Sequence, residues 1–172
     1  MDNVSGGNWS IKLDEKIYPL NDRSVDITDS SSLVPSQVKN LEVSNNIMSF
    51  LRFDIPSTIT DSHKINLNLV VDEDSTLDGG ISIQEYGQTG WGESPNNKNI
   101  GIIDHSLGAT LATLTPLDNG TIVWDNGTAV SMDNGTILSV DLTDKITSYG
   151  EEYSIAIRAL GTTDKVLSLI HI

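Results

Sequence analysis

Apolar and polar residues alternate in short stretches along much of this chain, a pattern typical of half-buried β-strands. In KINLNLVV, residues 64–71, the side chains of Ile65, Leu67 and Leu69 fall on one face and those of two asparagines on the other. The same period of two recurs at residues 9–13, 80–86, 121–124, 136–142 and 153–159. Clusters of Gly, Asn, Asp, Ser and Pro separate these stretches. Many short strands with turn residues between them predict an all-β fold, an antiparallel β-sandwich.

One segment departs from the period of two. TDKITSYG, residues 143–150, has Thr143 or Asp144 near its start and Gly150 as a stop, which predicts a short helix. No linker, heptad or low-complexity segment divides the chain. We therefore expect a single domain over residues 1–166 with at most one short helix.

The stretch SFLRFDIP, residues 49–56, has two different faces when it is drawn as a strand. Leu51, Phe53 and Ile55 form an apolar face that suits the core. The opposite face carries an aromatic ring, a cation and an anion, from Phe50, Arg52 and Asp54. This polar row is either a ligand-binding face or a solvated surface with an ion pair.

The tetrapeptide Asp-Asn-Gly-Thr occurs three times between residues 118 and 136. Asn-Gly suits type I′ hairpin turns, in which both central residues have positive φ. The alternatives are calcium ligation and N-glycosylation, since Asn-x-Ser/Thr sequons occur at Asn3, Asn8, Asn119, Asn126 and Asn134. Each repeat offers only one Asp to a metal, and nothing in the sequence points to a eukaryotic secretory route. The repeats therefore predict consecutive hairpin turns.

Charge narrows the range of partners. The chain of 172 residues has 24 acidic and 10 basic residues, for a net charge of −14. A surface that binds phosphate needs clustered Lys and Arg, so we expect neither a nucleic acid nor an anionic membrane as partner. No apolar run reaches the roughly 20 residues that span a bilayer. The chain has no cysteine, which excludes disulfides and thiolate metal sites.

The motifs that usually mark catalysis are missing from the sequence. It contains no nucleophile elbow, no P-loop, no dinucleotide-binding fingerprint and no pair of histidines at metal-binding spacing. Carboxylates are abundant because the whole chain is acidic, so a glycosidase pair cannot be chosen among them. We therefore expect a protein that is not an enzyme.

The best candidate metal site is the acidic segment VVDEDSTLDGG, residues 70–80. Hard oxygen ligands at this spacing suit calcium, and the two glycines permit a sharp turn. The ligands would be Asp72, Asp74 and Asp78. The segment lacks the EF-hand pattern, and the alternative is an acidic hairpin loop without a metal.

The best candidate carbohydrate site is EYGQTGWGESPNN, residues 85–97. Sugar rings present apolar C–H faces that stack on aromatic rings, and amides and carboxylates bond their hydroxyls. Tyr86 and Trp91 would stack, while Gln88, Glu93 and Asn96 would bind hydroxyls. The alternative is that Trp91 packs as a plug at one end of the sandwich.

The last six residues, LSLIHI, match what one frame of a common transposase-library adapter encodes. We therefore expect that residues 167–172 are not native and that the chain is a metagenomic fragment, cut off before its natural end.

Three ordered stretches together resemble the DNRLRE-type domains. They are SFLRFDIPSTITDSHKINLNLVV, ISIQEYGQTGWGESPNN and ILSVDLTDKITSYGEEYSIAIRA. In this resemblance Leu51, Arg52, Phe53 and Asp54 match the signature strand, and Trp91 and Glu93 match a Trp-x-Glu loop. The chain departs from the family at Ser94-Pro95, where a second Trp is usual, and it lacks the late Ser-Arg-Glu strand.

The resemblance implies a β-sandwich of jelly-roll type that serves as an accessory module in secreted or cell-surface proteins. It favours a framework role for Arg52 and Asp54. From it we expect a non-catalytic polysaccharide-binding module of a larger extracellular protein, whose neighbours are other domains of that protein. The glycan would be neutral or bridged by calcium, since the charge of the chain disfavours direct capture of an anionic one. The alternative is a structural or adhesive spacer with no small ligand.

Overall fold

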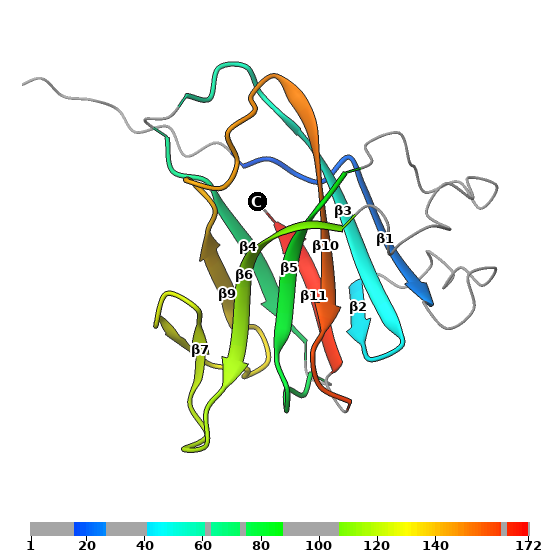
Figure 1. Cartoon of the computed structure of the whole chain (residues 1–172), viewed down its shortest axis with the longest axis vertical. Helices are drawn as coiled ribbons and strands as arrows, with labels where there is room; N and C mark the ends of the chain where they lie inside the picture. Colours follow the sequence, from blue (N-terminus) through cyan, green and yellow to red (C-terminus); the bar gives the residue numbers. More distant parts are fainter. Residues whose placement is uncertain are drawn as a thin grey trace, which may run out of the picture.

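The computed structural model describes residues 16–26, 41–60, 63–72, 75–87, 107–162 and 165–171. All regular elements within these ranges are β-strands, so the prediction of an all-β fold is confirmed (Figure 1). The strands are β1 (Asn21–Asp26), β2 (Leu41–Ser44), β3 (Ile47–Ile55), β4 (Asn66–Val71), β5 (Ile81–Tyr86), β6 (Leu107–Pro116), β7 (Ile122–Trp124), β8 (Ala129–Val130), β9 (Ile137–Asp141), β10 (Glu151–Ala159) and β11 (Lys165–His171).

Antiparallel pairing connects these strands into two facing layers. A curled sheet of seven strands has the order β8-β7-β6-β5-β10-β3-β1, and the other layer has the order β2-β11-β4-β9. Figure 1 shows β5, β10 and β3 side by side in the larger sheet, with β1 next to β3. The layers are continuous at β2, which pairs with β11 along its length and with β3 only at its end, between Ser44 and Ile47.

The main core lies between the two layers, as in a β-sandwich. Leu51 and Phe53 of β3 share one apolar cluster with Leu67 and Leu69 of β4. Each of these four side chains is at most 2% exposed. The predicted inward faces of residues 49–56 and 64–71 are therefore confirmed, whereas the stretch predicted at residues 9–13 lies outside the described residues.

A second, smaller cluster lies on the opposite face of the seven-stranded sheet. It contains Met48, Phe50, Tyr86 and Ala156, with Leu107 packed against it. Strand alternation puts Phe50 on the face opposite Leu51, and both side chains are fully buried. The larger sheet is therefore buried on both faces around β3 and β10, and not only on the face predicted from the sequence.

The Asp-Asn-Gly-Thr repeats form turns, but the predicted type I′ geometry is wrong. Among the described residues positive φ occurs only at glycines. Gly120 donates to the carbonyl of Leu117 at 2.9 Å, and Gly127 donates to the carbonyl of Trp124 at 2.8 Å. Each is a three-residue hairpin loop, a type I turn followed by a left-handed glycine. The glycine alone supplies the positive φ, so the asparagine need not adopt it.

The third repeat does not connect two strands that pair with each other. Thr136 donates to the carbonyl of Asp133 at 2.9 Å and Gly135 has a φ of 80°, which together indicate a type II turn. The Gly135 amide donates instead to Val71 of β4, at 2.8 Å. The same tetrapeptide thus adopts two turn types: in the first two repeats the glycine amide bonds within its own loop, and in the third it bonds to β4.

The helix expected over residues 143–150 is wrong. The segment has one turn, in which Lys145 and Ile146 both donate to the carbonyl of Leu142, and the residues after it continue without helical bonds. Thr143 accepts a bond from the amide of Ile65, and Gly150 donates to Ile55. A short helix is marginal by itself, so these bonds to other strands decide the local conformation.

The end of the chain forms a strand inside the smaller layer. β11 pairs with β2 over Lys165–Ser168 and with β4 over Ser168–His171. That residues 167–172 are not native stays a prediction.

Three hydrogen bonds hold β2 against β1 and β3 where β2 leaves the larger sheet. The Glu42 amide donates to the Ser24 hydroxyl at 3.0 Å, and the Ser49 hydroxyl donates to the Glu42 carbonyl at 2.6 Å. The two hydroxyls are 2.8 Å apart, and since the Ser49 proton is already used, Ser24 donates to Ser49. The three bonds form a closed ring that satisfies both backbone groups of Glu42.

Replacement of Ser49 by Ala should lower the free energy of unfolding by about 1–3 kcal/mol, because the Glu42 carbonyl loses its bond in a buried place. Urea unfolding measures the change. Ser139→Ala, on an exposed position of β9, is the matched control and should stay within about 0.5 kcal/mol of the parent. Equal losses in the two variants would contradict the role of the ring.

Candidate functional site

Tyr86, one of the two predicted stacking residues, ends β5 and lies in the second cluster. Its side chain is 3% exposed, and its ring centroid is 4.8 Å from that of Phe50 at an interplanar angle of 58°. Burial raises the pKa of the Tyr86 hydroxyl. The surface of the Tyr86 ring on which a sugar would stack is covered by the residues of this cluster.

The connection that carries the other predicted carbohydrate residues begins and ends at this cluster. Tyr86 pairs with Leu107 across β5 and β6, so both ends of the connection are fixed side by side. Gln88, Trp91, Glu93 and Asn96 lie outside the described residues. Their roles stay predictions.

The acidic segment predicted to bind calcium follows β4. Asp72 is half-buried and Asp78 is exposed, whereas Asp74 lies outside the described residues. Within the described part of the chain, no three Asp, Glu or His side chains come together as a metal-binding group. The calcium site therefore stays a prediction.

Two glycines fix the end of this acidic segment. A Cβ atom added to Gly79 would lie 2.3 Å from the Cα of Gly161, so the two backbones touch. Gly80 has a φ of 105°, and its carbonyl accepts a bond from Leu160 at 2.9 Å. The chain bends at Asp78 and Gly79, and these contacts hold the end of the acidic segment against the end of β10.

The polar row of SFLRFDIP contains an ion pair. Arg52 Nη1 lies 3.3 Å from Glu152 Oε2 of β10, and the side chains of the two residues are 17% and 43% exposed. Glu152 stands directly opposite Asp54 in the ladder. Arg52 therefore lies close to a carboxylate on the neighbouring strand, an arrangement compatible with the framework role implied by the resemblance.

A half-buried carboxylate that the sequence did not single out lies on the inner face of β5. The Tyr153 hydroxyl of β10 donates to Glu85 Oε1 at 2.8 Å. Burial, this bond and the negative charge of Glu85 together raise the pKa of Tyr153 well above its usual range. The signal in the sequence was an acidic residue at the third inward position of ISIQE, after Ile81 and Ile83.

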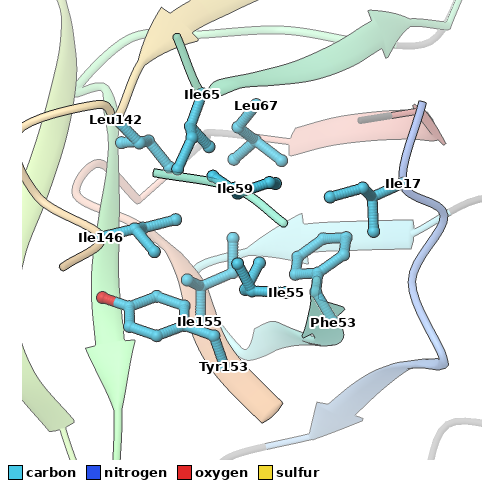
Figure 2. Close-up of a pocket in the computed structure, with 10 residues that line it drawn as sticks. All are labelled: Ile17, Phe53, Ile55, Ile59, Ile65, Leu67, Leu142, Ile146, Tyr153 and Ile155. Carbon is cyan, nitrogen blue, oxygen red and sulfur yellow. The ribbon is translucent and has the colours of Figure 1, made fainter. Parts of the chain in front are cut away.

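An apolar cavity of about 20 Å³ lies between the layers near this pair. Figure 2 shows its ten lining residues, with the Tyr153 ring at the edge of the group and its hydroxyl directed away from the cavity. The volume is about that of one water molecule, and the lining offers it no polar partner. The cavity is a gap in the packing, far too small for a sugar ring.

Comparison with known proteins gives no assignment: no protein-family model matches this chain, and no curated protein matches it. Within the described ranges, no helix has the length and apolar character needed to cross a membrane.

Replacement of Tyr153 by Phe tests the buried pair through alkaline stability. The folded state keeps this phenol protonated above the pKa of about 10 that it has when unfolded. Its contribution to stability is therefore complete below about pH 10 and is lost as the pH rises further. Tyr153→Phe should lower the unfolding free energy by about 1–2 kcal/mol at neutral pH and make its decline above pH 10 shallower.

Urea unfolding at a series of pH values measures both effects. Tyr18→Phe, at a ring that is 57% exposed, is the matched control and should change the neutral-pH value by less than about 0.5 kcal/mol. An alkaline decline that is as steep in Tyr153→Phe as in the parent would contradict the assignment.

Proposed function

We propose that this chain is a non-catalytic carbohydrate-binding module of a larger secreted or cell-surface protein. The proposal includes the jelly-roll form of the sandwich and kinship with the DNRLRE-type domains. Its ligand is a polysaccharide, neutral or bridged by calcium. The all-β sandwich-like fold and the location of residues 49–55 of SFLRFDIP in β3 are compatible with that kinship.

The observation that carries the proposal is the anchoring of the Trp91 connection. About 20 residues run from Tyr86 to Leu107, which are paired neighbours in one sheet. Long connections held by a rigid sheet are frequent places for binding residues. Trp91, Gln88, Glu93 and Asn96 supply the ring and the hydrogen-bonding groups that a sugar requires.

The second candidate is a structural or adhesive spacer with no small ligand. The packing of Tyr86 against Phe50 favours it, because this ring contributes to the fold whether or not a ligand is bound. The exposed acidic surface would then keep the module soluble between its neighbouring domains.

Replacement of Trp91 by Ala should weaken polysaccharide binding by at least about tenfold, the usual effect of removing an aromatic anchor. Trp91→Phe is the matched control and should retain part of the affinity, since it keeps a flat ring. Affinity electrophoresis on a panel of neutral and acidic polysaccharides, with and without calcium, measures both. A parent protein that no polysaccharide retards would support the spacer, and full affinity in Trp91→Ala would move the site elsewhere.

Calcium, if held by Asp72, Asp74 and Asp78, should raise the melting temperature by mass action. The triple Asn variant at these positions should lose that response. Differential scanning calorimetry with added calcium, and with magnesium as the control ion, measures it. A melting temperature that calcium leaves unchanged would remove the ion from the proposal and leave an acidic hairpin loop.

A further inference from the structure

The three Asp-Asn-Gly-Thr repeats offer three copies of one reactive bond in different surroundings. In an Asn-Gly pair the glycine nitrogen can attack the side-chain carbonyl carbon of the asparagine, because glycine has no side chain to hinder it. A C–N bond forms, the amide C–N bond breaks, and ammonia leaves. Water then opens the cyclic imide to aspartate or isoaspartate. The product has one more negative charge and needs no reactant besides water.

In each repeat a hydrogen bond restrains the attacking glycine nitrogen, but the acceptor lies in the same loop in two repeats and in another strand in the third. Gly120 and Gly127 donate to carbonyls three residues earlier, within their own hairpin loops. The asparagine side chains are held inside the same loops, since Thr121 and Thr128 donate to Asn119 and Asn126, both at 2.9 Å. Opening of the loop tip alone releases all of these groups.

The third repeat is hydrogen-bonded to β4 of the smaller layer. Gly135 donates to the carbonyl of Val71 at 2.8 Å, and the Val71 amide donates back to Thr136 at 2.9 Å. Val71 is 1% exposed and belongs to the main core. The start of the turn is held as well, because the Ser131 hydroxyl donates to Asp133 at 2.6 Å. To free the Gly135 nitrogen, the contact between β4 and the turn before β9 must open.

We propose that Asn119 and Asn126 are sites of spontaneous deamidation in the folded protein and that Asn134 is protected by its tie to β4. All three asparagines are exposed, so access of water does not distinguish them. Opening free energies are smallest at loop tips and approach the global value in core strands. A difference in deamidation rate between the repeats therefore reports the difference in the free energy needed to open each turn. The proposal is independent of carbohydrate binding.

The test uses the full chain, incubated at mildly alkaline pH and mapped by peptide mass spectrometry with detection of isoaspartate. Asn119 and Asn126 should each convert at least about fivefold faster than Asn134, the ratio given by about 1 kcal/mol of extra opening cost. The same incubation in denaturant is the internal control. There the three rates should converge, because the reacting tetrapeptides are identical.

Low, non-denaturing urea gives a second measurement. It should accelerate Asn134 more than Asn126, because opening at β4 exposes more surface than opening of a loop tip. Equal rates in the folded protein, or a faster Asn134, would overturn the proposal. A difference that persisted in denaturant would also overturn it, since the cause would then lie in the neighbouring sequence and not in the fold.

Discussion

The sandwich depends on how one short strand changes layers. β2 begins beside β11 and ends at its single pairing with β3, so among the strands that the structure describes it alone makes the two layers continuous in hydrogen bonding. Where β2 separates from β3, the ladder that would satisfy its backbone is broken. The hydroxyls of Ser24 and Ser49 replace that ladder by bonding the amide and the carbonyl of Glu42. Without them, buried peptide groups would lose their partners at the place where the layers join.

The two apolar clusters lie on opposite faces of the larger sheet. The larger sheet faces the smaller layer with Leu51 and Phe53, and its opposite face packs Phe50 against Tyr86. A strand buried on both faces needs small or apolar residues at every position near its centre. β10 meets this condition with Ser154 and Ala156 on one side and Ile155 and Ile157 on the other, each at most 2% exposed.

The strands could be predicted because alternation is a local property of the sequence. Residues 64–71 and 80–86 contain strands as predicted, and the inward face predicted for residues 64–71 is confirmed. The second cluster could not be found in this way, since burial of Phe50 and Tyr86 depends on what meets the outer face. Turn type was also beyond the local pattern: three identical tetrapeptides differ because only Gly135 meets the carbonyl of Val71.

The candidate site was less accessible to prediction than the fold. Composition indicated aromatic and acidic groups of the right kind, but a ring that stacks on a ligand and a ring that packs on Phe50 have the same residue type. The pair of Tyr153 and Glu85 required knowledge of the register between β10 and β5, in which the two residues come from positions 68 apart in the chain. Hydrogen bonds across such separations leave no periodic trace in a sequence.

The central ladder has a consequence for how the chain reaches this structure. β3 and β10 are neighbours in the larger sheet, yet Arg52 and Glu152 are 100 residues apart along the chain. The entropy cost of closing so long a loop arises before the contacts between β3 and β10 can offset it. A topology of this kind therefore folds slowly. The hairpins around Asn119 and Asn126 close only short loops and can form early. Until that loop closes, the edge of β3 that pairs with β10 in the native sheet has no partner from β10, and an unpaired strand edge is a place where strands of different chains can pair.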